Sequence, residues 1–252
     1  MTLQSLNRWK ASLIHLAVSA FIALVIVTLV VVVWYPAPYF SAMGGEVLLR
    51  LLIGVDVILG PLITLIVFDT AKPRLKYDLM AIAALQIAAL AYGGYIMFDA
   101  RPAYNVFVND RFETVAANAI DADSLVRADA QFRRLPLTGP RVVAANPPAD
   151  PADKAKIALD AMLGGHDLRD LPHLYVPYAQ ATARVASVTR PLAALARRDQ
   201  AAADQVSVFA TAHAAGGRSL GYVPVKARNK DFAAIVDRTT GEIVGYLSID
   251  PW

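Results

Sequence analysis

Residues 11–34, ASLIHLAVSAFIALVIVTLVVVVW, decide the fold class of this chain. The region between Lys10 and Glu46 contains no Asp, Glu, Lys or Arg. The polar interruptions of the stretch are Ser12, His15, Ser19 and Thr28. An α-helix rises about 1.5 Å per residue, so roughly 20 apolar residues cross the hydrocarbon core of a bilayer. The stretch therefore predicts a membrane-spanning helix.

Two further apolar stretches, residues 47–68 and 79–98, predict two more spanning helices. The connection between them, residues 69–78, is rich in Lys and Arg, whereas the connection at residues 35–46 has none. Because Lys and Arg stay on the cytoplasmic side of a membrane, we expect the amino terminus inside. Residues 99–252 are then expected outside.

A cleavable signal peptide is the alternative interpretation of the first stretch, because both begin with basic residues and continue with an apolar core. The core here is longer than the roughly 7–15 residues of a signal peptide. At Phe40-Ser41-Ala42, Phe occupies a position that a cleavage site gives to a small residue. We therefore expect a transmembrane domain over residues 1–98 and one extracytoplasmic domain over residues 99–252.

Composition limits what the outer domain can do. From Asp99 onward it has 18 Lys and Arg against 17 Asp and Glu, so it is nearly neutral and no nucleic-acid surface is expected. The chain has no Cys, which excludes disulfides, thiol catalysis and thiolate metal sites.

The outer domain has the pattern of an α+β fold. Residues 104–108 and 112–116 alternate around Asn109-Asp110 and predict a β-hairpin. Three more strands are expected at residues 220–225, 232–237 and 243–249. Helical patterns occupy residues 121–134, 150–163, 178–188 and 192–214. We therefore expect a single domain with an antiparallel sheet.

No catalytic motif accompanies this pattern. The sequence lacks GxSxG, HExxH, GxGxxG and Walker A signatures. His166 and His173 flank the acidic residues Asp167 and Asp170, but their spacing matches no helical or hairpin pair of metal ligands. The sequence therefore predicts a protein that is not an enzyme and that uses no metal or cofactor.

The residues that need an explanation lie inside the second and third apolar stretches. Asp56 falls well inside the second stretch, where a carboxylate is costly and needs a partner or a proton. Arg50 is about 120° away around the same helix, so we expect its side chain to extend toward the headgroups instead. Gln86 and Tyr92 of the third stretch are expected at similar depth.

Three interpretations of this intramembrane polar cluster follow. It can clasp the three helices, or Asp56 can face a polar group on another membrane helix. It can also form part of a proton or ion path, which a single buried acid serves poorly. Gly60-Pro61 breaks the second helix near its middle, either as a packing kink or as a groove for a partner helix.

Several short strings, taken in order, resemble the TfpX/TfpZ family of type IV pilin accessory proteins. The strings in the apolar half are Arg8-Trp9-Lys10-Ala11, Trp34-Tyr35-Pro36, Val55-Asp56 and Leu59-Gly60-Pro61-Leu62. Those in the outer half are Asp110-Arg111-Phe112, Tyr222-Val223-Pro224-Val225, Arg228, Asp231 and Asp250-Pro251-Trp252. None of the strings falls between residues 116 and 216.

The resemblance implies a chaperone-like protein of a bacterial inner membrane that binds or stabilises a cognate type IV pilin and modulates pilus assembly or dynamics. The partners would be the pilin, through its membrane helix and its outer head, and the lipid bilayer. It also makes Asp110, Arg111, Arg228, Asp231 and Trp252 candidate contact residues of the outer domain. A membrane enzyme that modifies pilin or its glycan, and a membrane sensor, are the alternatives.

The carboxyl-terminal tail is expected to be ordered together with the hairpin that precedes it. Between Phe232 and Ile249, successive side chains of each strand point to opposite faces, so apolar side chains lie on at least one face of the hairpin. A free terminal Trp would expose a large ring to water, so we expect Trp252 to dock on the domain or on the membrane surface. A frayed terminus is the alternative.

Overall fold

The computed structural model describes residues 7–213 and 217–252, and these form two compact units. The first unit contains residues 7–33 together with Gly45–Asp99. The second unit contains Trp34–Gly44 together with Ala100–Trp252. The short segment Trp34–Gly44 therefore packs with the second unit, although sequence reasoning had placed it in a transmembrane domain of residues 1–98.

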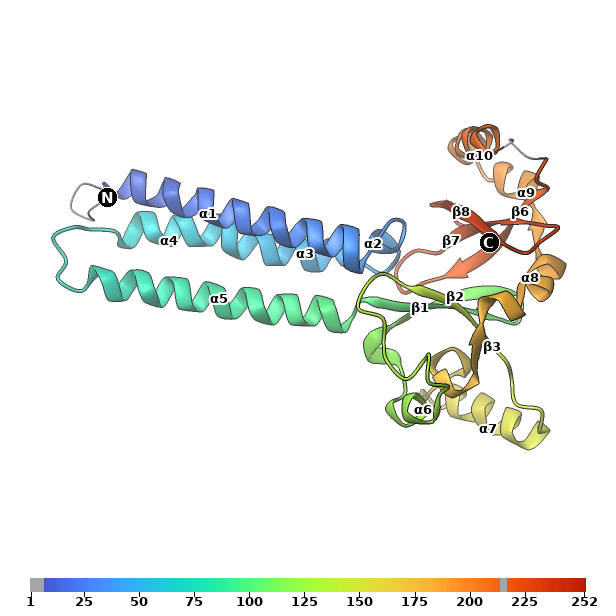
Figure 1. The fold of residues 1–252 in the computed structure, drawn as a ribbon. Helices are drawn as coiled ribbons and strands as arrows, with labels where there is room; N and C mark the ends of the chain where they lie inside the picture. Colours follow the sequence, from blue (N-terminus) through green and yellow to red (C-terminus); the bar gives the residue numbers. More distant parts are fainter. Residues whose placement is uncertain (1–6, 214–216) are drawn as a thin grey trace. The chain divides into compact units, whose positions relative to one another are not determined.

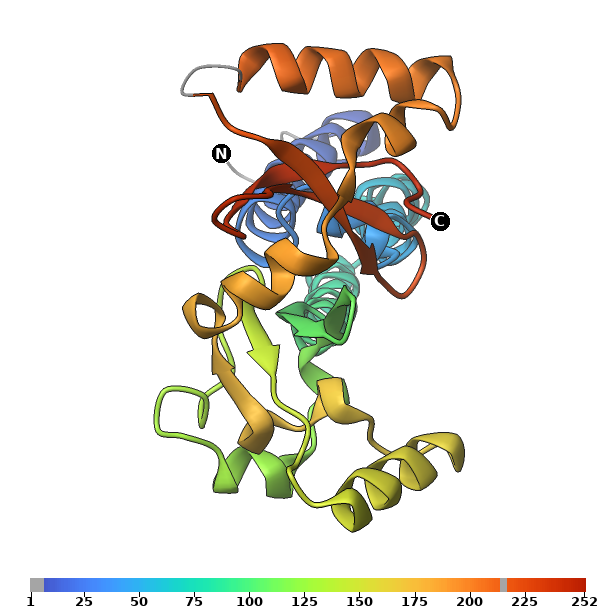
Figure 2. The same cartoon turned by 90° about the vertical axis from the view of Figure 1, so that its right-hand side faces the viewer.

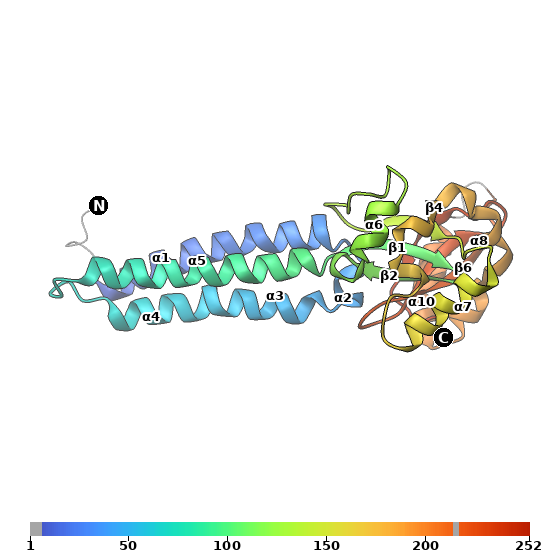
Figure 3. The ribbon, with the colours of Figure 1, turned by 90° about the horizontal axis from the view of Figure 1, so that it is seen from below.

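The three predicted apolar helices are confirmed as candidate membrane spans by their length and composition: Arg8–Trp34, Gly45–Val67 and Leu75–Asp99. They lie side by side in Figures 1 and 3. The elements of the first two are α1 (Arg8–Thr28), a π-helical segment (Leu29–Trp34), α3 (Gly45–Ile53), a second π-helical segment (Gly54–Leu59) and α4 (Gly60–Val67). The third is α5 (Leu75–Asp99). Large apolar side chains cover their outer faces, a pattern typical of membrane-spanning helices.

The second unit is built on an eight-stranded sheet with the order β4-β3-β1-β2-β6-β7-β8, and β5 pairs with β6. The strands are β1 (Pro102–Val108), β2 (Arg111–Ala116), β3 (Arg141–Ala145), β4 (Tyr175–Pro177), β5 (Arg190–Pro191), β6 (Leu220–Lys226), β7 (Phe232–Asp237) and β8 (Ile243–Leu247). The predicted hairpin forms β1 and β2, with Asn109 at a φ of 55° in its turn.

The prediction of an antiparallel sheet is wrong, because the sheet is mixed. β1 pairs in parallel with β3, and β2 pairs in parallel with β6. Parallel neighbours need long crossover connections, and the helical segments that follow β2 supply them. The local pattern predicted the strands, but it carries no information on which distant strands become neighbours.

Strand alternation divides the core of the second unit between the two faces of the sheet. One row runs across five strands through registered neighbours: Ala144, Phe107, Phe112, Val225 and Phe232. All five side chains are buried on the same face. On the opposite face, α9 (Leu192–Ala196) and α10 (Gln200–Ala212) cover the β6 to β8 end of the sheet (Figure 2).

The segment between the first two apolar helices supplies part of this core. Its short helix α2 (Tyr39–Ala42) places the Tyr39 ring edge-on against Phe232 and Tyr246, with ring centroids 5.3 Å and 5.6 Å away. The carbonyl of Ala42 accepts hydrogen bonds from the backbone N–H groups of Asn229 (2.8 Å) and Lys230 (3.2 Å). The sequence predicts only a connection here, because the segment lacks the hydrophobic periodicity of a buried helix or strand.

The helices of the second unit differ from the expected ones mainly at their ends. Only α6 (Ala122–Arg127) forms in the stretch expected to be helical to residue 134. α7 (Pro151–Met162) forms as expected, with the Asp150 side chain capping it. The stretch expected to be one helix over residues 192–214 is split into α9 and α10, because Asp199 caps a new helix by accepting from Ala202 N. Ala214 itself lies outside the described residues.

Candidate functional site

Two polar side chains of the first apolar stretch, Ser12 and His15, join α1 to α4 by hydrogen bonds. The Nδ1 atom of His15 lies 2.6 Å from the hydroxyl of Thr64. One turn earlier, the hydroxyl of Ser12 donates to the carbonyl of Pro61 at 2.9 Å. Ser12 and His15 are three residues apart and therefore share a helix face. That spacing was the signal that could have predicted this pair of contacts.

The Gly60-Pro61 step explains why Gln86 points at the second apolar helix. In the π-helical segment before it, the Gly60 N–H donates to the carbonyl of Val55, five residues back. The next bond of this kind would run from residue 61 to the Asp56 carbonyl, but Pro has no N–H. The side-chain nitrogen of Gln86 donates to that carbonyl instead, at 3.3 Å.

Gly60 is required for this contact. A Cβ at Gly60 would lie 2.0 Å from the side-chain nitrogen of Gln86 and 3.1 Å from Nε2 of His15. Side chains of α1 and α5 therefore both approach the second apolar helix at this residue, and a larger side chain would displace them.

The carboxyl group of Asp56, unlike its backbone carbonyl, has an oxygen without a hydrogen-bond donor among the described residues. The residue is 6% exposed, and its Oδ1 atom has no hydrogen-bond partner among the residues that the structure describes. A carboxylate at the centre of a membrane-spanning helix costs roughly 2.5–3.5 kcal/mol. π-Helical segments are common at functional positions of helices, and Asp56 lies within one.

Asp56 lines a groove of about 280 Å³ between the second and third apolar helices. The wall from the second helix consists of Leu48, Leu51, Leu52 and Val55 beside Asp56, which follow one helix face. The wall from α5 consists of Ala89, Leu90, Tyr92, Gly93 and Ile96. The groove is therefore apolar except for one buried acid and the Tyr92 side chain.

The other residues predicted to lie with Asp56 inside the membrane make different contacts. Gln86 contacts the Asp56 carbonyl and not its carboxyl group. Tyr92 is 69% exposed at the groove. The Nε atom of Arg50 donates to the Glu46 carbonyl of its own helix at 3.2 Å. Pro61 acts through the backbone, as described above.

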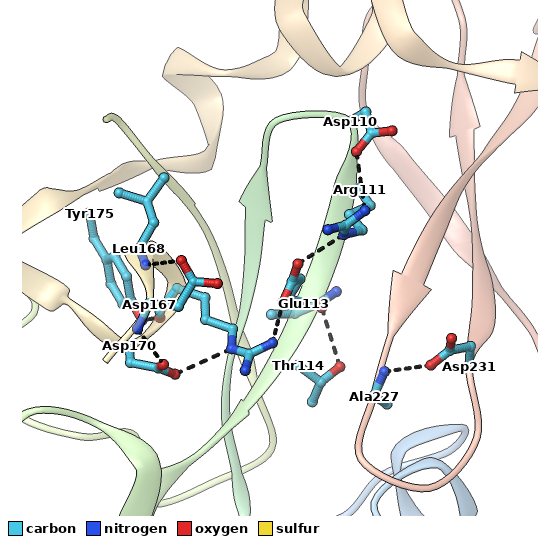
Figure 4. A network of polar contacts seen from close by, with 12 residues as sticks. Asp110, Arg111, Glu113, Thr114, Asp167, Leu168, Asp170, Tyr175, Ala227 and Asp231 are labelled. Atoms are coloured by element: carbon cyan, nitrogen blue, oxygen red, sulfur yellow. Dashed lines mark hydrogen bonds and ion pairs between the residues drawn. The ribbon is translucent and has the colours of Figure 1, made fainter. Parts of the chain in front are cut away.

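In the second unit, a buried carboxylate organises a polar network (Figure 4). Glu113 is 5% exposed; it accepts from Nε of Arg111 at 2.8 Å and forms a short ion pair with Arg169. Arg169 also lies 3.5 Å from Asp170. Burial alone would raise the pKa of the Glu113 carboxyl, but the hydrogen bonds and charges of Arg111 and Arg169 outweigh burial and hold that pKa below its usual value.

The carboxyl-terminal tail docks on the same unit. The ring nitrogen of Trp252 donates to Asp231 at 2.7 Å. The guanidinium carbons of Arg190 and Arg111 lie 5.3 Å and 5.9 Å from its ring centroid, within cation–π range. Arg190 and Arg111 also flank Asp110, at 3.9 Å and 3.7 Å.

The structure therefore brings together four of the five outer-domain candidates: Asp110, Arg111, Asp231 and Trp252. Arg228 is exposed and lines a separate hollow of about 610 Å³.

Deleting Pro251-Trp252 is expected to destabilise the second unit by about 1–2 kcal/mol, since it removes one charged hydrogen bond and the cation–π contacts. Limited proteolysis of the full chain in detergent would show this as faster cleavage. Met162→Ala is the matched control, because Met162 is 85% exposed. Equal cleavage rates for the deletion variant and the wild type would show that the tail contributes nothing to stability.

The histidines of the second unit take part in ordinary contacts. Nδ1 of His173 lies 2.6 Å from the hydroxyl of Ser124, and Nε2 of His166 lies 3.7 Å from Asp121. Within residues 7–213 and 217–252, no group of three or more His, Asp or Glu side chains is placed to hold a metal ion.

These features define a class of protein: three candidate membrane spans joined to a domain with a mixed sheet. A family model described as "Fimbrial assembly protein FimB" matches residues 4–44. The chain is 34% identical over 187 residues to "Fimbrial assembly protein, serogroup I" of Dichelobacter nodosus, covering 73% of this chain and 72% of that relative. The chain belongs to this family of fimbrial assembly proteins.

Two further relatives from Dichelobacter nodosus agree with this membership. The serogroup E1 protein is also 34% identical over 187 residues, with the same coverage. The protein of serogroups C1 and C2 is 38% identical over 122 residues, which cover 47% of this chain and 92% of that relative. No solved structure shows a significant match to the chain.

Proposed function

We propose that this protein is an inner-membrane accessory protein of type IV fimbrial biogenesis that binds and stabilises a cognate pilin and so modulates pilus assembly. The resemblance to TfpX/TfpZ proteins supports the same role. The observation that carries the proposal is the similarity, over nearly three quarters of the chain, to proteins named for fimbrial assembly.

The architecture suits this role. A pilin before assembly has one spanning helix and an outer head, so a helper needs surfaces both within the membrane and outside it. The candidate spans and the second unit offer one of each. Binding and stabilising a pilin requires contact surfaces but no chemical reaction.

The alternative is an enzyme that modifies pilin. A hollow of about 690 Å³ in the second unit is a candidate substrate site for it, and His166, His173 and Asp121 are among the lining residues. The pair nearest to a catalytic geometry is Ser124 with His173. Ser124 is fully buried, and its hydroxyl accepts the His173 backbone N–H at 3.1 Å. A substrate cannot reach that hydroxyl, so we favour the accessory role.

Topology is the first expected outcome of the proposal. We expect the amino terminus and the connection at Asp69 to Lys76 in the cytoplasm and the second unit in the periplasm. The reason is that Lys and Arg flank the spans at residues 8–10 and 72–76, whereas the connection at residues 35–46 has none. Reporter fusions within Asp69 to Lys76 and after Arg101 test it. Activity of a cytoplasmic reporter fused after Arg101 would refute the orientation.

The role itself predicts that the cognate pilin is degraded faster in cells that lack this protein. Pulse-chase labelling of the pilin, with and without a plasmid carrying the full chain, measures that difference. An unchanged pilin half-life together with normal piliation would remove the accessory role.

A further inference from the structure

The groove at Asp56 has features that folding of the first unit alone does not explain. Its one buried acid lacks a hydrogen-bond partner at Oδ1 among the described residues, although Gln86 lies close enough to bond the carbonyl of the same residue. Folding thus satisfies the carbonyl of Asp56 and leaves its buried Oδ1 atom without a donor, beside a groove that Asp56 lines. A buried polar group of this kind requires a donor from elsewhere.

The shape of the groove indicates a helical occupant. Its walls follow single faces of two neighbouring helices, from Leu48 to Asp56 and from Ala89 to Ile96, which corresponds to about two helical turns. Ala89 and Gly93 are four residues apart, so their small side chains leave room for another helix backbone to approach α5 closely. A lipid chain could fill the apolar part, but it has no hydrogen-bond donor for Asp56.

A second copy of this chain offers few donors at this depth. Tyr92 of α5 is 69% exposed and carries a hydroxyl, but it lines the groove itself. Other exposed side chains of α1 and α5 are apolar, as at Phe21, Leu24, Leu85 and Ile87. Ser19 of α1 is buried, and Thr28 donates to the Leu24 carbonyl of its own helix at 2.8 Å. Contact with a second copy is therefore an outcome that the test has to exclude.

We propose that this groove receives the spanning helix of the client protein, which presents small residues and one side-chain hydroxyl or amide that donates to the Asp56 carboxyl. The inference rests on the proposed function, in which that client is the pilin. It assigns the intramembrane half of recognition to Leu51, Val55, Asp56 and Gly93. Neutral donors suit the site, because the carboxyl can accept from them in either protonation state.

The test uses the full chain in cells that express the cognate pilin. A photocrosslinking amino acid is placed at Leu51, which is 66% exposed and lines the groove, or at Ile66, which is 72% exposed on the same helix outside the groove. The pilin adduct is expected from Leu51 and not from Ile66. Adding Asp56→Leu should reduce the Leu51 adduct about three- to tenfold, the range that one hydrogen bond between membrane helices supplies.

Asp56→Asn separates recognition from folding, because its amide oxygen can still accept the client's hydrogen bond. It should retain most of the adduct, and Arg50→Gln should leave the adduct unchanged, since Arg50 lies outside the groove. Protein levels are measured for every variant. A loss of adduct that only follows a loss of protein would contradict recognition.

Failure of this inference can be told apart from failure of the proposed function. If pilin co-purifies with the chain but Leu51 and Ile66 crosslink to it equally, or neither does, the groove is not the contact and the proposed function stands. An adduct at Leu51 with lipid alone or with a second copy likewise overturns the assignment. If no pilin co-purifies under any condition, the proposed function falls and the inference with it.

Discussion

Tyr39→Ala is expected to lower the free energy of unfolding of the second unit by about 3–5 kcal/mol, the usual cost of truncating a fully packed aromatic side chain. Tyr39 is 3% exposed and contacts Phe232 and Tyr246 in the core. Denaturant unfolding of the full chain in detergent, followed by the near-ultraviolet signal of the second unit, measures the change.

Val126→Ala provides the matched control for this variant, because Val126 is 74% exposed in the same unit. A change below about 1 kcal/mol for Tyr39→Ala, close to the control, would show that the segment between the apolar helices is not part of the core. The larger change would mean that the fold of the second unit depends on residues that lie between the first two apolar helices in sequence.

Glu113→Gln is expected to destabilise the second unit by about 2–4 kcal/mol at neutral pH, because it leaves the charges of Arg111 and Arg169 without their shared partner. The lower end is expected if solvent reaches the two guanidinium groups, which are 35% and 37% exposed.

The pH dependence of this contribution has a defined sign. The pKa of Glu113 is lowered in the folded state, so its stabilising contribution is present above the unfolded-state pKa of about 4.3 and is lost as the pH falls through the lower folded-state pKa. The stability difference between wild type and Glu113→Gln should therefore shrink below about pH 4. A difference that stays constant from neutral pH down to acid unfolding would contradict this account of the network.

The fold was predictable from the sequence where it depends on neighbouring residues. The apolar stretches predicted at residues 11–34, 47–68 and 79–98 agree with the helices, because hydropathy and length are local properties. The hairpin at Asn109-Asp110 was predictable for the same reason. The parallel pairing of β2 with β6 was not, since more than a hundred residues separate the two strands.

The candidate site was predictable in part. Depth along the helices placed Asp56 near Gln86, and in the structure the Gln86 side chain donates to the Asp56 carbonyl. Hydropathy could not show that Gln86 would bond the backbone, because this depends on a π-helical segment and on the N–H that Pro61 lacks. Docking of Trp252 on the domain was an expectation from the cost of exposing a large ring, whereas its partners Asp231 and Arg190 came only from the structure.

The most direct test of the central claim is capture of the pilin by this protein in the membrane. The full chain, tagged at its amino terminus, is crosslinked in cells that make the cognate pilin, solubilised and purified, and its adducts are identified by mass spectrometry. Our account predicts a pilin adduct that persists in wild type and in Arg50→Gln and weakens in Asp56→Leu. Recovery of well-folded protein with no pilin adduct, from cells that contain abundant pilin, would contradict it.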